Sequence, residues 1–155
     1  MVIEVSRADV ADEGVQACLA ESAALMAALF PPEDNHGIAP GAEDPELCMF
    51  AAREGGRVIG TAAMAPRDGY GEVKAMFVSP GLQGHGIGAQ LLAAVEDEAR
   101  ARGIDCLRLE TGAPLAAACR LYRKVGYRDR AAFGEYADGT TSIFMEKTLT
   151  PLSPP

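Results

Sequence analysis

The residues with the clearest chemical potential lie in the run Gln83-Gly84-His85-Gly86-Ile87-Gly88, which follows an apolar stretch and the turn Ser79-Pro80-Gly81. The glycines fall where a loop enters a predicted helix. At such a position, free N–H groups and the positive end of the helix dipole favour an anion. Missing side chains also let a pyrophosphate approach the backbone closely. The segment therefore predicts a site for a phosphate-bearing cofactor.

Two other glycine-rich motifs account less well for this segment. A Walker loop requires Gly-Lys followed by Ser or Thr, which does not occur here. Gly84, Gly86 and Ala89 fit the dinucleotide spacing, and Glu110 ends the next predicted strand. However, five residues separate Val78 from Gly84, whereas the dinucleotide turn follows its strand closely. A nicotinamide-dependent protein is therefore retained only as a rival hypothesis.

The same segment resembles the acetyl-CoA motif of the GNAT superfamily of N-acetyltransferases, whose signature is Arg/Gln-x-x-Gly-x-Gly/Ala. A second family feature follows in the correct order, as Leu121-Tyr122 and then Gly126-Tyr127. The motifs and the order of elements match over almost the whole chain. The resemblance implies an α+β fold with a mixed, mostly antiparallel central sheet flanked by helices. It also implies that the sheet is splayed between its fourth and fifth strands, with acetyl-CoA in the opening.

The resemblance further implies which residues hold the co-substrate. The backbone of Met76, Phe77 and Val78 would pair with the pantetheine arm like an added strand, and one of these N–H groups would polarise the thioester carbonyl. His85 would offer only its backbone N–H. Leu115 stands where many relatives carry a cofactor-contacting asparagine, so anchoring there is expected to differ. The pyrophosphate loop would comprise Gln83, Gly84, His85, Gly86, Ile87, Gly88 and Ala89.

Three side chains are candidates for acetyl transfer itself. Tyr122 matches the family tyrosine near the thioester sulfur, and its hydroxyl would protonate the departing thiolate as well as contact the cofactor. A primary amine has a pKa of about 10, so a carboxylate would help it to lose a proton before attack. Glu110 matches the glutamate that serves as base in family members acetylating protein amino termini. The alternatives are Glu72 as the base, water as the base, and a reaction without a dedicated base.

The elements that must position these residues follow from hydrophobic periodicity and from glycine and proline positions. Strands are predicted over residues 2–6, 47–53, 57–65, 72–78, 106–110, 127–133 and 141–148. Helices are predicted over residues 11–30, 86–102 and 114–125. Because several strands adjoin directly, the order favours a mixed α+β sheet over a doubly wound parallel one. The long loop over residues 31–45 is of a length that is often functional.

Composition limits the partners that this chain can have. Its 155 residues fit one domain, predicted over residues 1–149 with a flexible tail over 150–155. The net charge of −8 disfavours nucleic acid and anionic membranes. Neither a secretory signal nor a membrane-spanning run is recognisable, and four widely spaced cysteines indicate free thiols in the cytoplasm rather than a metal site.

Charge is distributed unevenly along the chain. Residues 1–72 contain 4 basic and 13 acidic residues, whereas residues 73–155 contain 10 basic and 9 acidic ones. This division favours a cationic acceptor on one half and an anionic cofactor on the other. We therefore expect an acetyl-CoA-dependent N-acetyltransferase acting directly on a primary amine of a small cationic or amino-acid-like acceptor, with a homodimer as the expected assembly. The alternative is a GNAT-fold sensor or interaction module that binds acetyl-CoA without turnover.

Overall fold

The computed structural model describes residues 2–30, 46–134, 136 and 141–151. The predicted loop over residues 31–45 and most of the predicted tail lie outside the described residues. The elements follow the predicted order. They are β1 (Glu4–Ala8), α1 (Glu13–Leu29), β2 (Cys48–Glu54), β3 (Arg57–Pro66), β4 (Gly71–Val78), α2 (Ile87–Ala101), β5 (Cys106–Gly112), α3 (Ala116–Lys124), β6 (Arg128–Arg130) and β7 (Ser142–Thr148).

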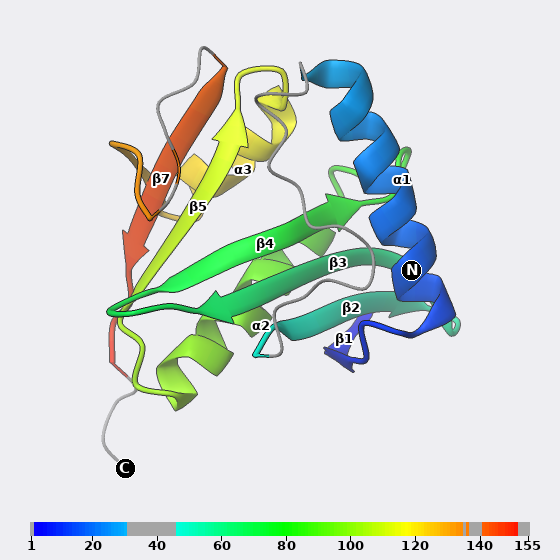
Figure 1. Cartoon of the computed structure of the whole chain (residues 1–155). Helices are drawn as coiled ribbons and strands as arrows, with labels where there is room; N and C mark the ends of the chain where they lie inside the picture. The colour runs from blue at the N-terminus through cyan, green and yellow to red at the C-terminus, as the bar shows by residue number, and fades with distance from the viewer. Residues whose placement is uncertain (1, 31–45, 135, 137–140, 152–155) are drawn as a thin grey trace.

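The strands form one mixed sheet in the order β1-β2-β3-β4-β5-β7-β6 (Figure 1). Neighbouring strands are antiparallel except β4 and β5, which are parallel. These two strands pair only at Gly71–Leu107 and Glu72–Arg108, and then diverge. The predicted splay between the fourth and fifth strands is thereby confirmed. Strands β1 to β4 pair antiparallel, so this sheet is not the doubly wound parallel sheet that a dinucleotide site would need.

The helices cover both faces of the sheet, with α1 on one face and α2 and α3 on the other (Figure 1). Strand β2 shows how the sequence supports this layering. Cys48, Phe50 and Ala52 belong to the core under α2, whereas Met49 and Ala51 pack with residues of α1. Because both faces of this strand are buried, its sequence is an unbroken apolar run rather than an alternating one.

Several predicted boundaries shift by one or more residues in the structure, including β1, which was predicted over residues 2–6, and two of these shifts have clear local reasons. Helix α1 begins at Glu13 instead of Ala11, because the Asp12 side chain caps it by accepting from the N–H groups of Gly14 and Val15. Strand β6 is shorter than the predicted run over residues 127–133. Its pairing with β7 stops at Arg130, and Phe133 then packs its buried ring against other aromatic side chains.

Strand β4 contains a bulge at the point where it leaves β5. One β3 residue, Ala62, faces two β4 residues, Ala75 and Met76. Ala75 adopts a positive φ of 54°, which is unusual for a residue with a Cβ. The Thr61 hydroxyl donates to the Ala75 carbonyl over 2.7 Å and so provides a partner for this displaced group. A bulge of this kind redirects the backbone that follows it.

Candidate active site

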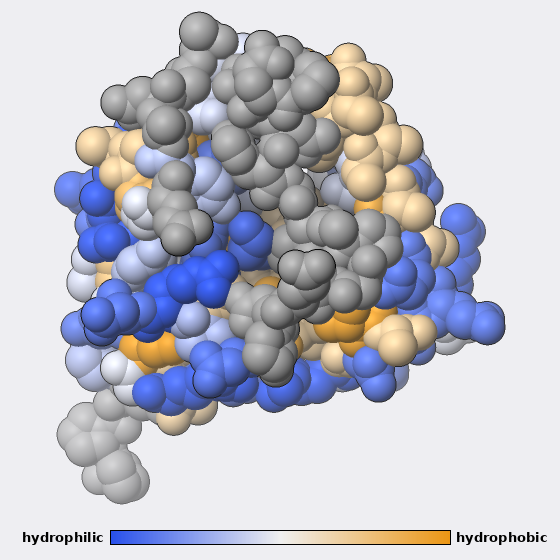
Figure 2. All heavy atoms as spheres, viewed as in Figure 1, coloured by the Kyte–Doolittle hydropathy of each residue, from blue (hydrophilic) through white to orange (hydrophobic). Residues whose placement is uncertain are grey.

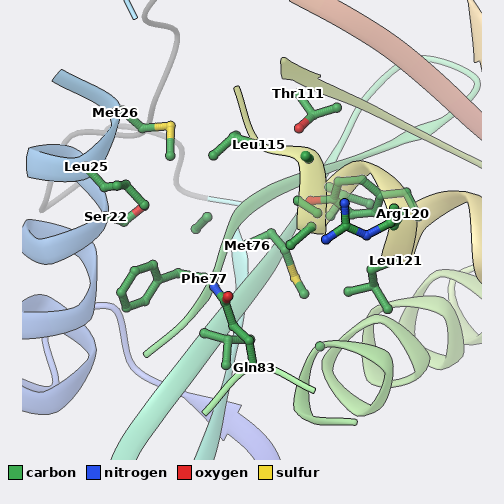
Figure 3. A pocket seen from close by; sticks show the side chains of 18 of the residues that line it. Ser22, Leu25, Met26, Met76, Phe77, Gln83, Thr111, Leu115, Arg120 and Leu121 are labelled. Carbon is green, nitrogen blue, oxygen red and sulfur yellow. The ribbon is translucent and has the colours of Figure 1, made fainter. Parts of the chain in front are cut away.

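A cavity of about 1270 Å³ opens where β4 and β5 diverge. Figure 3 shows Ser22, Leu25 and Met26 of α1 on one side of it and Leu115, Arg120 and Leu121 on the other. The divergent part of β4 and the loop into α2 complete its walls. The cavity brings together all the predicted site residues except His85, which is exposed and does not line it. Three predicted catalytic residues share this cavity, namely Tyr122, Glu110 and Glu72.

The glycines of the loop before α2 serve two different purposes. Gly84 and Gly86 have φ values of 88° and 79°, and a Cβ at either position would contact nothing within 4 Å. They are therefore needed for a left-handed backbone that leaves the loop open. Gly88 is needed for close packing, because a Cβ there would lie 2.5 Å from Leu121 Cδ2 and 3.1 Å from Met76 Cε.

The start of α2 fits an anionic phosphate group. Gly86 is the N-cap residue and provides no side-chain hydrogen bond to the first turn, which also contains no acidic residue. Unpaired N–H groups at such an end favour an anion. Gln83 lines the cavity beside this end, and Arg120 and Lys124 of α3 add positive charge to the same cavity. The residues present thus fit the pyrophosphate of coenzyme A.

We expect Gly84→Ala to weaken coenzyme A binding several-fold. The backbone must either keep a φ of 88° with a Cβ, at a cost of about 1–2 kcal/mol, or relax out of its open conformation. Gly56→Ala is the matched control, because Gly56 has a φ of 84°, also has open space around it, and lies in the β2–β3 turn. Calorimetric titration should show weaker binding for the first variant only. Equal affinity in both variants would contradict a role of this loop in binding.

Tyr122 lies on α3 with its side chain turned into the protein. It is 5% exposed, lines the cavity, and packs edge-to-face against Tyr127 with ring centroids 5.8 Å apart. Burial, and to a lesser extent the neighbouring Cys119, raises the pKa of its phenol. The hydroxyl therefore keeps its proton throughout the neutral range and can act as a hydrogen-bond or proton donor.

Glu72 is a buried carboxylate with several hydrogen-bond donors. It is 4% exposed and accepts from Arg67 Nε over 3.2 Å, from Lys74 Nζ over 3.4 Å and from the Tyr136 hydroxyl. Burial, followed by the hydrogen bond to Glu72, raises the pKa of Tyr136. Both oxygens of Glu72 are thus occupied by donors, an arrangement that favours a structural role over proton transfer.

Glu110 approaches the same cavity from β5. Ser142 Oγ, on the neighbouring strand β7, donates to its Oε2 over 2.9 Å. Glu110 is only half-buried, in contrast to Glu72. The two carboxylates therefore stand on the two strands that diverge, in different surroundings.

Sequence reasoning missed some residues of this site and some of the contacts within it. Lys74 follows Glu72 by two residues, so strand alternation was an available signal for placing both on one face. Tyr136 is 64 residues away from Glu72, and no local pattern predicts their contact. The apolar wall that α1 contributes to the cavity was also missed. Its Leu25 and Leu29 line the cavity and are 39% and 38% exposed. Figure 2 shows apolar surface gathered over α1.

The cysteines are not arranged for covalent catalysis in the described residues, where none lines the cavity. Burial raises the pKa of the thiols of Cys18, Cys48 and Cys106, which makes them poor nucleophiles. The described ranges also contain no group of His, Cys, Asp and Glu residues suited to hold a metal ion. A helix long and apolar enough to cross a membrane is not found in the described part of the chain.

Comparison with known proteins agrees with this geometry. Residues 17–127 match the model of the acetyltransferase (GNAT) family. A protein of Azospirillum brasilense named IAA acetyltransferase is 40% identical over 150 residues, covering 95% of this chain and 98% of that protein. The aminoalkylphosphonate N-acetyltransferase of Salmonella typhimurium is 32% identical over 98 residues, 59% of this chain and 64% of that one. A crystal structure from Klebsiella pneumoniae, described as an acyl-CoA N-acyltransferase, superimposes with a TM-score of 0.82 at 32% identity, covering 96% and 99% of the two chains.

Proposed function

The chain belongs to the acetyltransferase (GNAT) family of acyltransferases, with acetyl-CoA as co-substrate, and we propose that it transfers the acetyl group directly to a primary amine of a small acceptor. The observation that carries this proposal is the cavity between the diverging strands, whose lining includes Tyr122, Glu110 and the β4 backbone after the bulge. Holding amine and thioester together in such a cavity accelerates the reaction by orientation alone.

In the proposed reaction, acetyl-CoA supplies an acetyl thioester, and the residues of the cavity handle the charges. A backbone N–H of residues 76–78 polarises the thioester carbonyl. Glu110 takes a proton from the amine, directly or through water, while nitrogen bonds to the carbonyl carbon and the carbon–sulfur bond breaks. Tyr122 gives its proton to the departing sulfur. The products are the acetylated amine and coenzyme A, after which Glu110 loses its proton to solvent and Tyr122 regains one.

For the acceptor we propose an amino-acid-like amine in preference to a polycation. Lys74 lines the cavity beside Glu72, and Arg67 pairs with the same carboxylate from outside the lining, so this end of the cavity carries positive as well as negative groups. A second positive charge on the acceptor would be repelled there, whereas an acidic group beside the amine would be attracted. The aminoalkylphosphonate acceptor of the Salmonella typhimurium relative combines an amine with an acidic group in this way.

The test is release of free thiol from acetyl-CoA with a panel of aminoalkylphosphonates, amino acids, polyamines, aminoglycosides and short peptides. We expect turnover with acceptors that carry both an amine and an acidic group. Thermal stabilisation by acetyl-CoA without turnover on the panel would favour the alternative, a binding module. Absence of stabilisation would overturn the proposed co-substrate site. We further propose a cytoplasmic enzyme that forms a homodimer, which size-exclusion chromatography with light scattering would test.

A further inference from the structure

Three charged residues of the cavity lie on the face of the sheet that α1 covers. Lys74 pairs directly with Ala63, which belongs to the apolar cluster packed with α1, so the two side chains share that face. Glu72 lies two residues before Lys74 and therefore on the same face. Glu110 of β5 also lies there, because its neighbour Leu109 belongs to the core on the opposite face. A molecule on the α1 side of the cavity meets all three charges.

Lys74 is the positively charged member of this group. Its side chain is 17% exposed, and its ammonium lies 3.4 Å from Glu72 Oε2 and donates to the Tyr136 hydroxyl over 3.1 Å. An ammonium has three N–H donors, so these two contacts within the described residues leave one for a ligand. Arg67 pairs with the other oxygen of Glu72, so two positive charges meet one negative charge here and leave a net charge of +1. A singly charged carboxylate matches that excess.

Glu110 provides negative charge near the same place. Burial, then the hydrogen bond and the charge of Glu72, and then the charge of Glu110 raise the pKa of Tyr136, so Glu110 lies within electrostatic range of the tyrosine that contacts Lys74. The reaction proposed above brings the attacking amine to Glu110. An amine at Glu110 and an acidic group at Lys74 together fit one small zwitterion.

The wall that α1 contributes to the cavity is apolar. Leu25 and Leu29 both line the cavity and remain more than a third exposed. Figure 3 shows Leu25 and Met26 with their side chains toward the cavity, and Phe30 continues the lining at the end of the helix. Apolar surface of this kind gains free energy when an apolar group covers it. The acceptor that uses this wall therefore carries a bulky apolar group beside its charged ones.

We propose that the acceptor is an α-amino acid with a bulky apolar side chain, whose carboxylate binds Lys74 and whose side chain packs against the α1 wall at Leu25. The inference rests on the proposed function and narrows its acceptor. It makes Lys74 a specificity-determining residue of the reaction. Carboxylate and side chain can be removed from the acceptor one at a time, so each contact has its own test.

The carboxylate contact is tested with leucine and with isopentylamine, which is leucine without its carboxylate. Release of free thiol from acetyl-CoA gives kcat/KM for each acceptor. In Lys74→Met the ratio of leucine to isopentylamine should fall about tenfold or more below the parent ratio, through a higher KM for leucine. The different basicities of the two amines cancel between parent and variant. Any loss of folded protein cancels within each ratio.

Lys147→Met is the matched control for this test. Lys147 is 23% exposed and pairs with the buried Glu96 over 2.9 Å. Its ammonium lies 5.9 Å from the centre of the Tyr127 ring, and Lys74 lies 5.8 Å from the centre of its own tyrosine neighbour. Lys147 does not line the cavity, so its replacement should leave the ratio unchanged.

The α1 wall is tested with leucine and alanine, which differ only in the side chain. In Leu25→Ala the leucine-to-alanine ratio of kcat/KM should fall about threefold or more, because only leucine reaches the truncated side chain. Val2→Ala is the control, since Val2 is also an exposed apolar residue but does not line the cavity. It should keep the parent ratio.

Each part of the proposal can fail separately. An unchanged leucine-to-isopentylamine ratio in Lys74→Met would overturn the carboxylate contact, and an unchanged leucine-to-alanine ratio in Leu25→Ala would overturn the contact with the α1 wall. Turnover confined to acceptors without an acidic group, or without an apolar side chain, would overturn the acceptor class while acetyl transfer to an amine stands. Absence of turnover with every amine would instead overturn the proposed function.

Discussion

Tyr122→Phe is expected to lower kcat by about 100-fold or more and to leave KM for acetyl-CoA little changed. The variant keeps the ring, which is buried against Tyr127, so the fold and the cavity are retained. It removes only the hydroxyl that we propose as proton donor to the departing sulfur. Loss of a group that acts in the transition state reduces kcat, whereas loss of uniform binding would raise KM.

Steady-state kinetics with the identified acceptor would measure this effect, with Tyr127→Phe as the control. The Tyr127 hydroxyl is also buried, lies on a neighbouring ring and has no partner among the described residues, but Tyr127 does not line the cavity. Its removal should leave kcat unchanged. Because burial raises the pKa of Tyr122, activity should show no loss from its ionisation at any pH below about 10. Unchanged kcat in Tyr122→Phe would remove this residue as the acid.

Glu110→Gln is expected to lower kcat/KM by about 100-fold at neutral pH. The amide of Gln keeps the size of the side chain and can still accept from Ser142, but it takes no proton from an amine. The deficit should shrink as the pH rises toward about 10, where the free amine loses its proton unaided. A pH–rate profile of variant and parent would show the two curves converging on the alkaline side.

Glu72→Gln distinguishes the role of the Glu72 carboxylate from that of Glu110. This change leaves Arg67 and Lys74 beside a neutral amide in a largely buried position, so we expect a loss in the free energy of unfolding of about 2 kcal/mol. Its rate should not recover selectively at high pH. If instead Glu72→Gln shows the alkaline recovery and Glu110→Gln does not, Glu72 is the base.

The order of elements and the glycine loop could be predicted because their signals are local. Alternating or fully apolar runs marked the strands, and the glycine pair at residues 55–56 marked the turn between β2 and β3, where both adopt positive φ. The loop from Gln83 to Gly88 combines unusual φ values with a helix start, and both depend on neighbouring residues only. Such features can be recognised from a short stretch of sequence.

The rest of the site depends on contacts between distant segments. The bulge in β4 places an alanine, Ala75, at positive φ, which no residue preference would suggest. Its carbonyl is held by Thr61 of another strand. The reason for a glycine at position 88 likewise becomes visible only when α3 brings Leu121 against α2. Sequence spacing carries no information on such partners.

The divergence of β4 and β5 creates two strand edges inside the sheet. Beyond the pairs at Gly71–Leu107 and Glu72–Arg108, neither strand has the other as a ladder partner. Open edges are templates on which a foreign strand can pair, and they promote aggregation when they are accessible. Parts of both strands line the cavity described above, so a strand-like ligand in this cavity would cover these edges. A ligand that pairs with these edges would stabilise the folded chain, because it binds only the folded form.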